Sequence, residues 1–396
     1  MFLKWIALVG VVGCLFGRPA DADTVVPTER VTTWISVRDK PMPGATEVGR
    51  LAPGDSAKKI DTTRYWHKVE LLDGTIGYVA RTWTRVVEDM ASGDDLVVTF
   101  IDIGEGDAIL LQVGAIDILV DAGPRGAWKR GLEATLASIN GPLEALYITH
   151  PHDDHYGGGK DVLFEKDVKA VYTNGEKRGK PRDPDSLSTW DDFVGAVKTK
   201  GLALQSLDVG KILLPAPGLK VTVLATGSES GGAFKDTANG ADINNDSLVL
   251  MVEFGSRRLL LTGDLETAAD SMLVKRYCEN GSSKTCPKLR ADVLKVPHHG
   301  SASFDEDFFV AVGAPWAVIS AEFESEKHHL PRTETIDSLR TLRSKIISTS
   351  ADGTENAVLK MTRAGVLKWT KMPSNDIFGW RKTASGHDKV SYPQGQ

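Results

Sequence analysis

The sequence predicts an α+β fold in which layered sheets are covered by helices, preceded by a small all-β barrel. Two observations lead to this prediction. Residues 30–87 alternate short β-rich runs with turns such as PMPG, APGD and LDGT, at the spacing expected of a small barrel. From Leu96 onward, apolar strand-like runs alternate with segments of helical spacing, such as GAWKRGLEATLASIN at 126–140.

The domain boundaries are expected where these patterns change. We place the barrel at 24–88, a polar linker at 89–95, the sheet-and-helix domain at 96–372 and a polar, mobile tail at 373–396. The chain has 396 residues, of which 41% are hydrophobic and 25% are charged, so it is long enough for two domains with a sizeable core.

The charge of the chain limits the kinds of partner. A net charge of −6 argues against a general polyanion-binding surface, so any nucleic-acid contact has to be local. The basic segment EKRGKPR at 176–182 is a candidate for such a contact, although a solvated charged loop is the simpler interpretation.

Residues 1–22 have the features of a secretory signal peptide. Lys4 precedes an apolar run that is too short to cross a membrane as a stable helix, and small residues follow it. Two kinds of processing fit: cleavage after Ala22, which ends an A-x-A sequence, and lipid attachment to Cys14 in VVGC. An uncleaved N-terminal helix is the third possibility. Either kind of processing places the protein in the periplasm, in the cell envelope or outside the cell, and we expect no transmembrane span in the mature chain.

Cys278 and Cys286 flank seven residues rich in Gly and Ser. Outside the cytoplasm we expect a disulfide that closes this loop, with two inert thiols as the alternative. A zinc site is disfavoured, because the spacing is not C-x2-C and no histidine lies nearby.

The nine histidines are unevenly distributed, and the densest group, HPHDDH at 150–155, follows an apolar strand. His150 and His152 are two positions apart, so they point to the same side of the strand end and can hold one cation. Asp154 and His155 follow in a Gly-rich turn that can bend them toward a second cation. Imidazole with carboxylate suits Zn²⁺, and carboxylate-rich sets suit Mn²⁺ or Fe²⁺.

The segments VRDKPMPGATEVGRLAPGD and YWHKVELLDGTIGYVARTW, within residues 30–87, resemble the bacterial Src-homology-3-like (SH3-like) domain. They contain the family's arginine after a strand valine, its glycine–leucine strand, its tryptophan and its glycine–tyrosine–valine close. The resemblance implies a surface that binds cell-wall peptides or, equally, a structural spacer.

The motif HPHDDH has the form H-x-H-x-D-H, and through it residues 96 to about 370 resemble the metallo-β-lactamase superfamily. Four other segments are similar to the metallo-hydrolase domain of ComEC-type competence proteins, namely DIGEGDA (102–108), NNDSLVL (244–250), LLTGD (260–264) and LKVPHHGS (294–301). The resemblance implies a four-layer αββα sandwich with two divalent metal ions, Zn²⁺ or Mn²⁺, at the sheet edges.

The same resemblance implies a ligand set. The expected metal ligands are His150, His152, Asp154, His155, Asp264 and His329, with Asp264 bridging the two ions. Asp121 in ILVDAG is expected to support the metal-site loop. Asn245 stands where many relatives have a third histidine, and its weaker amide oxygen would favour Mn²⁺. His328 is the alternative to His329, and two exposed loop histidines without a role are the plainer interpretation of that pair.

The sequence allows more than one role for each of the two histidines in LKVPHHGS. His298 could bind metal, hydrogen-bond to a ligand or give a proton to the leaving group, and we expect one of the last two. His299 is expected to hydrogen-bond to a ligand or to pack in the core. The catalytic residues are expected to be Asp154, Asp264 and His298.

These residues predict an exported metal-dependent hydrolase in which two ions activate a hydroxide for attack on a phosphodiester, such as a nucleic acid. Hydrolysis of a carbonyl substrate (a β-lactam, lactone or thioester) is the first alternative, because a fold alone does not assign chemistry. A non-catalytic binding protein of the cell envelope is the second.

Overall fold

The computed structural model describes residues 24–28, 30–52, 55, 57–71, 74–87, 94–175, 184–226, 241–321, 328–349, 356–371 and 377–392. The chain divides into two compact units, Met1–Ala91 and Ser92–Gln396. Three sequence predictions lie outside the described residues: the signal peptide with Cys14 and Ala22, most of the 89–95 linker, and the basic segment 176–182. Within the part that is described, no helix is long and apolar enough to cross a membrane.

The first unit consists of one sheet with the strand order β3-β2-β6-β5-β4-β1-β7. Its strands are β1 (Thr24–Pro27), β2 (Ile35–Arg38), β3 (Glu47–Leu51), β4 (Ala57–Thr62), β5 (Trp66–Glu70), β6 (Ile76–Ala80) and β7 (Thr84–Val87), and η1 (Arg81–Trp83) is a short 3-10 turn. Buried residues alternate along β5 and β6, and the apolar ones, such as Val69 and Val79, meet in a small core. The SH3-like family of this unit stays a prediction.

The second unit contains two large mixed sheets. The first has the order β13-β12-β11-β10-β9-β8-β21-β22 and the second β14-β15-β16-β17-β18-β19-β20. The strands of the first are β8 (Leu96–Phe100), β9 (Ile109–Val113), β10 (Ile116–Val120), β11 (Leu143–Ile148), β12 (Val171–Thr173), β13 (Leu204–Ser206), β21 (Ala357–Met361) and β22 (Leu367–Lys371). Those of the second are β14 (Ile212–Ala216), β15 (Leu219–Ala225), β16 (Val249–Phe254), β17 (Arg257–Leu261), β18 (Val293–Lys295), β19 (Trp316–Ile319) and β20 (Lys345–Ser348).

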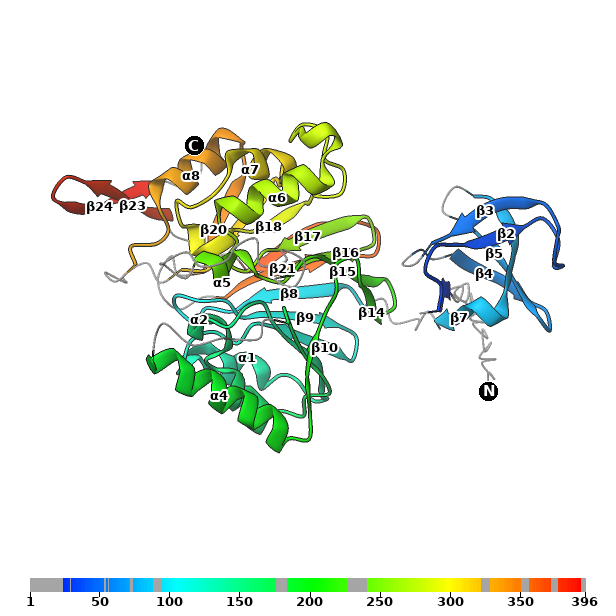
Figure 1. Ribbon diagram of the computed structural model, residues 1–396, viewed down its shortest axis with the longest axis horizontal. Coiled ribbons are helices and arrows are strands. Elements are labelled where there is room, and N and C mark those ends of the chain that lie inside the picture. The colour runs from blue at the N-terminus through cyan, green and yellow to red at the C-terminus, as the bar shows by residue number, and fades with distance from the viewer. Residues whose placement is uncertain are drawn as a thin grey trace, which may run out of the picture. The chain divides into compact units, whose positions relative to one another are not determined.

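The two sheets pack face to face, and helices cover both outer faces (Figure 1). Alternation along the strands builds these layers, because successive side chains point to opposite faces. In β10, Ile118 and Val120 pack between the sheets and Leu119 packs against the helices. In β17, Leu261 packs between the sheets and Leu260 against the helices on the other side. The order of layers is therefore helices, sheet, sheet, helices, as the resemblance implied.

The helices complete the two outer layers and the connections between strands. They are η2 (Trp128–Leu132), α1 (Glu133–Leu136), α2 (Asp153–Tyr156), α3 (Gly159–Glu165), α4 (Pro184–Thr199), α5 (Ala241–Asn245), α6 (Thr267–Tyr277), η4 (Glu279–Gly281), η5 (Pro297–Gly300), α7 (Glu306–Val312) and α8 (Thr333–Thr341). A disulfide joins Cys278, which directly follows α6, to Cys286.

The segment that we expected to be a mobile tail contains a hairpin of β23 (Ile377–Thr383) and β24 (Gly386–Tyr392). Ile377 is part of the apolar cluster over the second sheet, and the backbone N–H of Trp380 donates to Pro331 O at 2.8 Å. The polar composition concealed this, since alternate residues of an exposed hairpin face water.

Candidate metal centre

The candidate metal centre lies where strands of both sheets end. In the first sheet β10 and β11 are parallel, and in the second β17 and β18 are parallel. The carboxyl ends of parallel strands lie at the same edge of a sheet, so the loops that follow them meet there. The histidine motif follows β11, Asp264 follows β17 and His299 follows β18 within η5.

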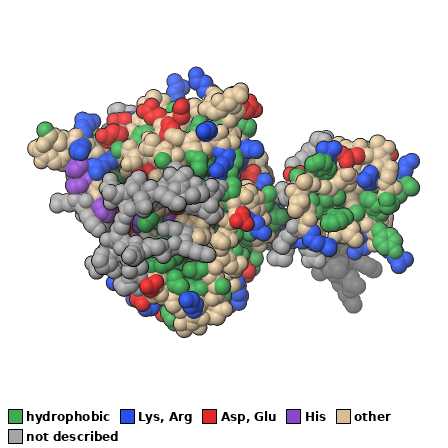
Figure 2. Space-filling model, viewed as in Figure 1, with side chains coloured by type: hydrophobic (Ala, Val, Ile, Leu, Met, Phe, Trp, Pro, Cys, Tyr) green, Lys and Arg blue, Asp and Glu red, His purple; other side chains and the backbone are tan. Residues whose placement is uncertain are grey.

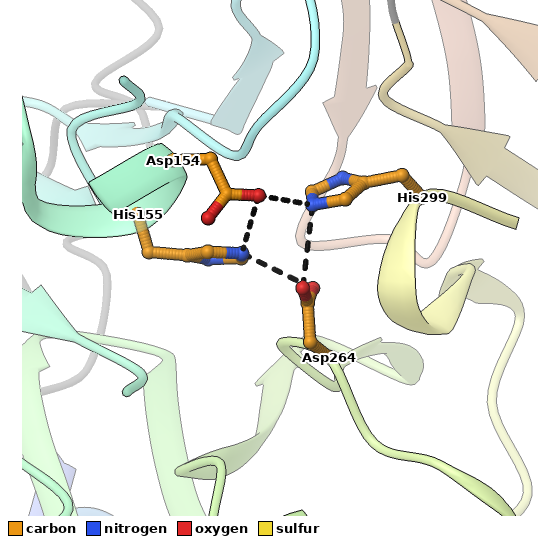
Figure 3. Close-up of side chains that lie close together, drawn as sticks. All are labelled: Asp154, His155, Asp264 and His299. Atoms are coloured by element: carbon orange, nitrogen blue, oxygen red, sulfur yellow. Dashed lines mark hydrogen bonds and ion pairs between the residues drawn. The ribbon is translucent and has the colours of Figure 1, made fainter. Parts of the chain in front are cut away.

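Four side chains converge at this edge: Asp154, His155, Asp264 and His299, each offering a ligand atom within 4.8 Å of the others (Figure 3). His155 Nε2 lies 3.1 Å from Asp264 Oδ1 and 3.8 Å from Asp154 Oδ2. His299 Nε2 lies 3.1 Å from Asp154 Oδ2 and 3.4 Å from Asp264 Oδ2. We call these four residues the ligand cluster.

The other ring nitrogens of the two histidines are held by the protein. Asp121 Oδ2 lies 2.9 Å from His155 Nδ1, and its carboxylate accepts from Thr149 N at 2.7 Å and Thr149 Oγ1 at 2.8 Å. The Nδ1–H of His299 donates to Ser320 O at 2.8 Å. Each Nε2 is therefore directed into the cluster, and Asp121 lies behind His155, on the side away from the cluster.

His150 and His152 lie beside the cluster, as their spacing suggested. His150 Nε2 is 3.1 Å from His152 Nδ1 and 3.9 Å from Asp264 Oδ2. Burial lowers the pKa of His150 well below its ordinary value, and a neutral imidazole is the form that binds metal. Asp264 thus faces both groups of histidines.

The electrostatics of the ligand cluster favour added positive charge. Burial lowers the pKa of His299, but the carboxylates of Asp264 and Asp154 outweigh this and raise it to about 10. Burial likewise lowers the pKa of His155, and the same carboxylates raise it well above its ordinary value. Burial raises the pKa of Asp264, but both imidazoles hold it well below its usual range. Without metal, protons provide the positive charge that a divalent cation would supply.

The cluster also fits a metal by its chemistry. His155 Nε2 and Asp264 Oδ1 are buried, and neither atom has a hydrogen-bond partner among the described residues. Buried polar atoms are normally paired, so two such atoms 3.1 Å apart indicate a missing partner common to both. Two imidazoles with two carboxylates suit Zn²⁺ or Mn²⁺.

His298 and Asn245 lie at the edge of the site in different roles. His298 Nδ1 is 3.2 Å from Glu266 Oε1, and its side chain is 26% exposed. Burial lowers the pKa of His298, but Glu266 and Asp264 raise it overall. Asn245 Oδ1 accepts from the backbone N–H groups of Glu266 and Ala269, so it caps the N-terminus of α6. Its amide oxygen is thereby occupied, and the structure does not place it among the ligands.

The two candidates for the last motif histidine lie away from the ligand cluster. His329 stacks on His387 at 4.1 Å between ring centroids and meets Trp380 edge-on at 4.9 Å. His328 pairs through Nδ1 with Glu105. The position in the cluster that we expected His329 to take is occupied by His299, for which we expected support of a ligand or core packing.

A left-handed turn explains the position of His299. His298 and His299 have φ angles of 45° and 51°, so η5 turns one imidazole into the cluster and the other toward Glu266. Asp107 and Lys295, for which the sequence predicts no role, form a buried ion pair at 2.8 Å. The only sequence signal for this pair was that each residue lies in a motif, DIGEGDA or LKVPHHGS.

Comparison with known proteins agrees with this geometry. Residues 101–313 match the family model of the metallo-β-lactamase superfamily. The chain is 28% identical over 278 residues to ComE operon protein 3 of Bacillus subtilis (65% of this chain, 32% of that protein). It is 22% identical over 292 residues to Recombination protein 2 of Haemophilus influenzae (72% and 32%) and 24% identical over 294 residues to Competence protein ComA of Neisseria gonorrhoeae (71% and 36%).

The chain spans about a third of the length of these curated relatives. The family match covers more than half of the chain and includes the histidine motif, Asp264 and His299. The chain therefore belongs to the metallo-β-lactamase superfamily.

Proposed function

We propose that this protein is an exported hydrolase that cuts phosphodiester bonds of nucleic acids with the help of two divalent cations. The observation that carries the proposal is the ligand cluster, in which two imidazoles and two carboxylates lie at the shared edge of the two sheets. A nucleic-acid substrate is favoured because one relative is named for recombination and another for competence.

In this proposal Asp154, His155, Asp264 and His299 would hold one cation, and His150, His152 and Asp264 would hold the other. Divalent cations in such sites polarise a phosphoryl group and lower the pKa of water enough to supply a nucleophile at neutral pH. Zn²⁺ and Mn²⁺ both suit these ligands.

The protein's own residues orient the site and manage one proton. Asp121 and the Ser320 carbonyl hold the Nδ1 atoms of His155 and His299, so that each Nε2 is directed into the cluster. His298 is partly exposed, and its Nδ1 lies 3.2 Å from Glu266 Oε1. We assign it the role of giving its Nε2 proton to the oxygen of the leaving nucleotide as the P–O bond breaks.

A paired assay tests the reaction class. Purified protein supplied with Zn²⁺ or Mn²⁺ is given bis-p-nitrophenyl phosphate, a single-stranded oligonucleotide and a chromogenic cephalosporin. We expect turnover of the diester and the oligonucleotide. Turnover of the cephalosporin alone would favour a carbonyl substrate, and turnover of none would favour a binding protein.

A matched pair of variants shows whether the turnover belongs to this site. Asp264→Asn should lower kcat/KM for the diester by at least about 100-fold, because losing even a group that supports a metal ligand costs 10–100-fold. Asp117→Asn is the control, since Asp117 is also buried but bonds to Gln112 Nε2 at 2.7 Å. Equal loss in both variants would contradict the assignment.

The export part of the proposal rests on residues 1–22 and gains support from the disulfide, because disulfides persist in oxidising compartments. Intact-mass measurement of the protein from its own cell envelope tests it. Cleavage after Ala22 gives a shortened, unmodified chain, and processing at Cys14 gives a lipid-modified chain. A full-length chain recovered from the cytoplasm would overturn export.

A further inference from the structure

The hairpin of β23 and β24 has one face that combines aromatic rings with cations. The strands pair in the register Trp380↔Lys389 and Lys382↔His387, so these four side chains lie on the same face. Lys389 Nζ also lies 4.9 Å from the centre of the Phe378 ring. Residues 377–392 contribute no carboxylate to this face, because Asp388 pairs with Arg381 on the other one.

The opposite face of the hairpin is fixed to the body of the unit. Ile377 packs into the apolar cluster over the second sheet, and a side chain at Gly379 would collide with Ile336 of α8. The hairpin is therefore anchored at its base, and its tip extends outward (Figure 1). Lys382 and Lys389 are exposed on the face that the anchor leaves accessible.

A chain of contacts connects this face to the metal centre. His329 stacks on His387 and touches Trp380, so it continues the aromatic face toward the body. The neighbouring His328 pairs with Glu105. Next to Glu105, Gly106 lies so close to Asp154 that a Cβ there would be 2.4 Å from the Asp154 carbonyl oxygen.

The histidines and cations collect at this end of the unit. Figure 2 shows His side chains together with Lys and Arg side chains at the end where the hairpin lies. The two lysines of this face belong to a chain whose net charge is −6. Planar rings alternating with cations are what an unpaired nucleic-acid strand requires, because bases stack on rings while phosphates pair with lysines.

We propose that this face of the hairpin binds the single-stranded nucleic acid on one side of the bond that is cut. The inference rests on the proposed function for its substrate class and adds the position of the substrate. Bases stack on Trp380 and on the His329–His387 pair, while Lys382 and Lys389 contact phosphates. The hairpin thus acts on long substrates only, since a small diester reaches the metal centre without touching it.

Binding to metal-free protein tests this without any turnover. A fluorescein-labelled 20-nucleotide oligo-dT is titrated with chelator-treated protein at several salt concentrations. For Lys382→Ala/Lys389→Ala, the slope of log Kd against log salt should become shallower by about 1.4, at 0.7 for each lost phosphate contact on a single strand. For Trp380→Leu, Kd should rise about tenfold, as expected for a lost stacked base.

A matched control comes from another surface of the same unit. Lys198→Ala/Lys200→Ala removes two exposed lysines at the end of α4, one of which also lies over an aromatic ring, 5.1 Å from the centre of Phe164. This variant should bind oligo-dT like the unchanged protein. Loss of the same size in both double variants would show a general charge effect and would overturn the proposal.

Kinetics separates the hairpin from the reaction itself. The double variant of Lys382 and Lys389 should raise KM for the oligonucleotide about tenfold, with kcat and the turnover of bis-p-nitrophenyl phosphate unchanged. Unchanged KM and unchanged oligo-dT binding overturn the hairpin inference while the proposed function stands. If the unchanged protein cuts neither substrate, the proposed function fails, and the oligo-dT titration still decides the hairpin inference.

Discussion

Lys295 is a fully buried lysine at the end of β18, close to the metal centre. Its Nζ lies 2.8 Å from Asp107 Oδ2 and donates to Val296 O at 3.0 Å. Asp107 is equally buried, and its backbone N–H donates to Asp154 O at 3.1 Å. The ion pair therefore ties the loop before β9 to the strand that leads into His299.

Replacing Lys295 by methionine tests how much this pair stabilises the second unit. Lys295→Met keeps a long side chain but removes the ammonium that lies 2.8 Å from the buried Asp107 carboxylate, and leaves His299, with Nδ1 3.7 Å from Asp107 Oδ1, as the nearest cation among the described residues. Breaking a buried ion pair in this way costs about 3–5 kcal/mol of unfolding free energy. For a unit of this size that lowers the melting temperature by roughly 5–8 °C. The double variant Asp107→Asn/Lys295→Met removes both charges of the pair and should recover most of the loss.

Thermal melting followed by circular dichroism measures the effect in chelator-treated protein, so that weakened metal binding does not contribute. Lys220→Met is the matched control, because Lys220 Nζ also lies 2.8 Å from a carboxylate, Glu253, but at a partly exposed position. It should cost less than about 1 kcal/mol. A Lys295→Met protein that melts within about 2 °C of the unchanged chain would refute the reasoning. A double variant less stable than the single one would refute it as well.

Three further substitutions test other parts of the structure. Burial raises the pKa of Asp270 well above its ordinary value, so the folded state keeps a proton that the unfolded state releases as pH rises from about 4. The stability that this group contributes is lost as pH rises. The free energy of unfolding of Asp270→Asn in urea, measured relative to the unchanged protein, should therefore be more favourable at pH 8 than at pH 4. The same difference at both pH values would contradict this. The free energy of unfolding of Cys278→Ser/Cys286→Ser should be lower by about 2–3 kcal/mol, because the disulfide closes a loop across eight positions. A reductant should leave the melting temperature of this variant unchanged. Gly106 has a φ of 132° and lies against a backbone carbonyl of the metal-site loop. Gly106→Ala should therefore raise the Kd for Zn²⁺, measured by calorimetry, at least about tenfold. Gly126→Ala is the control, because Gly126 has open space around it, and its Kd should not change.

The parts of the site that follow simple periodicity could be predicted from sequence. Strands buried on both faces appear as continuous apolar runs, so the runs that became β11 and β17 were recognisable, and the polar residues directly after them lie at the sheet edge. His150 and His152 have the spacing of two that places them side by side. Asp121 comes directly after β10, and its carboxylate lies 2.9 Å from His155 Nδ1.

The parts that depend on irregular backbone could not be predicted. His298 and His299 are adjacent, and only their left-handed φ angles decide which one enters the ligand cluster. No periodicity rule applies to such a turn, so His329, placed before a helix as the superfamily usually has it, was the expected ligand instead. The β23–β24 hairpin was missed for a related reason, since its anchor is a few tertiary contacts rather than an apolar stretch.

The origin of the ligands connects the metal centre to the stability of the sandwich. Asp154 and His155 follow a strand of the first sheet, whereas Asp264 and His299 follow strands of the second. Neither sheet alone offers the cluster, so a binding site exists only when the two sheets have packed through their shared core. A cation that binds this folded state and not the unfolded chain stabilises it by about 2.7 kcal/mol at one hundred times its Kd. Because such an ion would be held by ligands from both sheets, this free energy would oppose their separation.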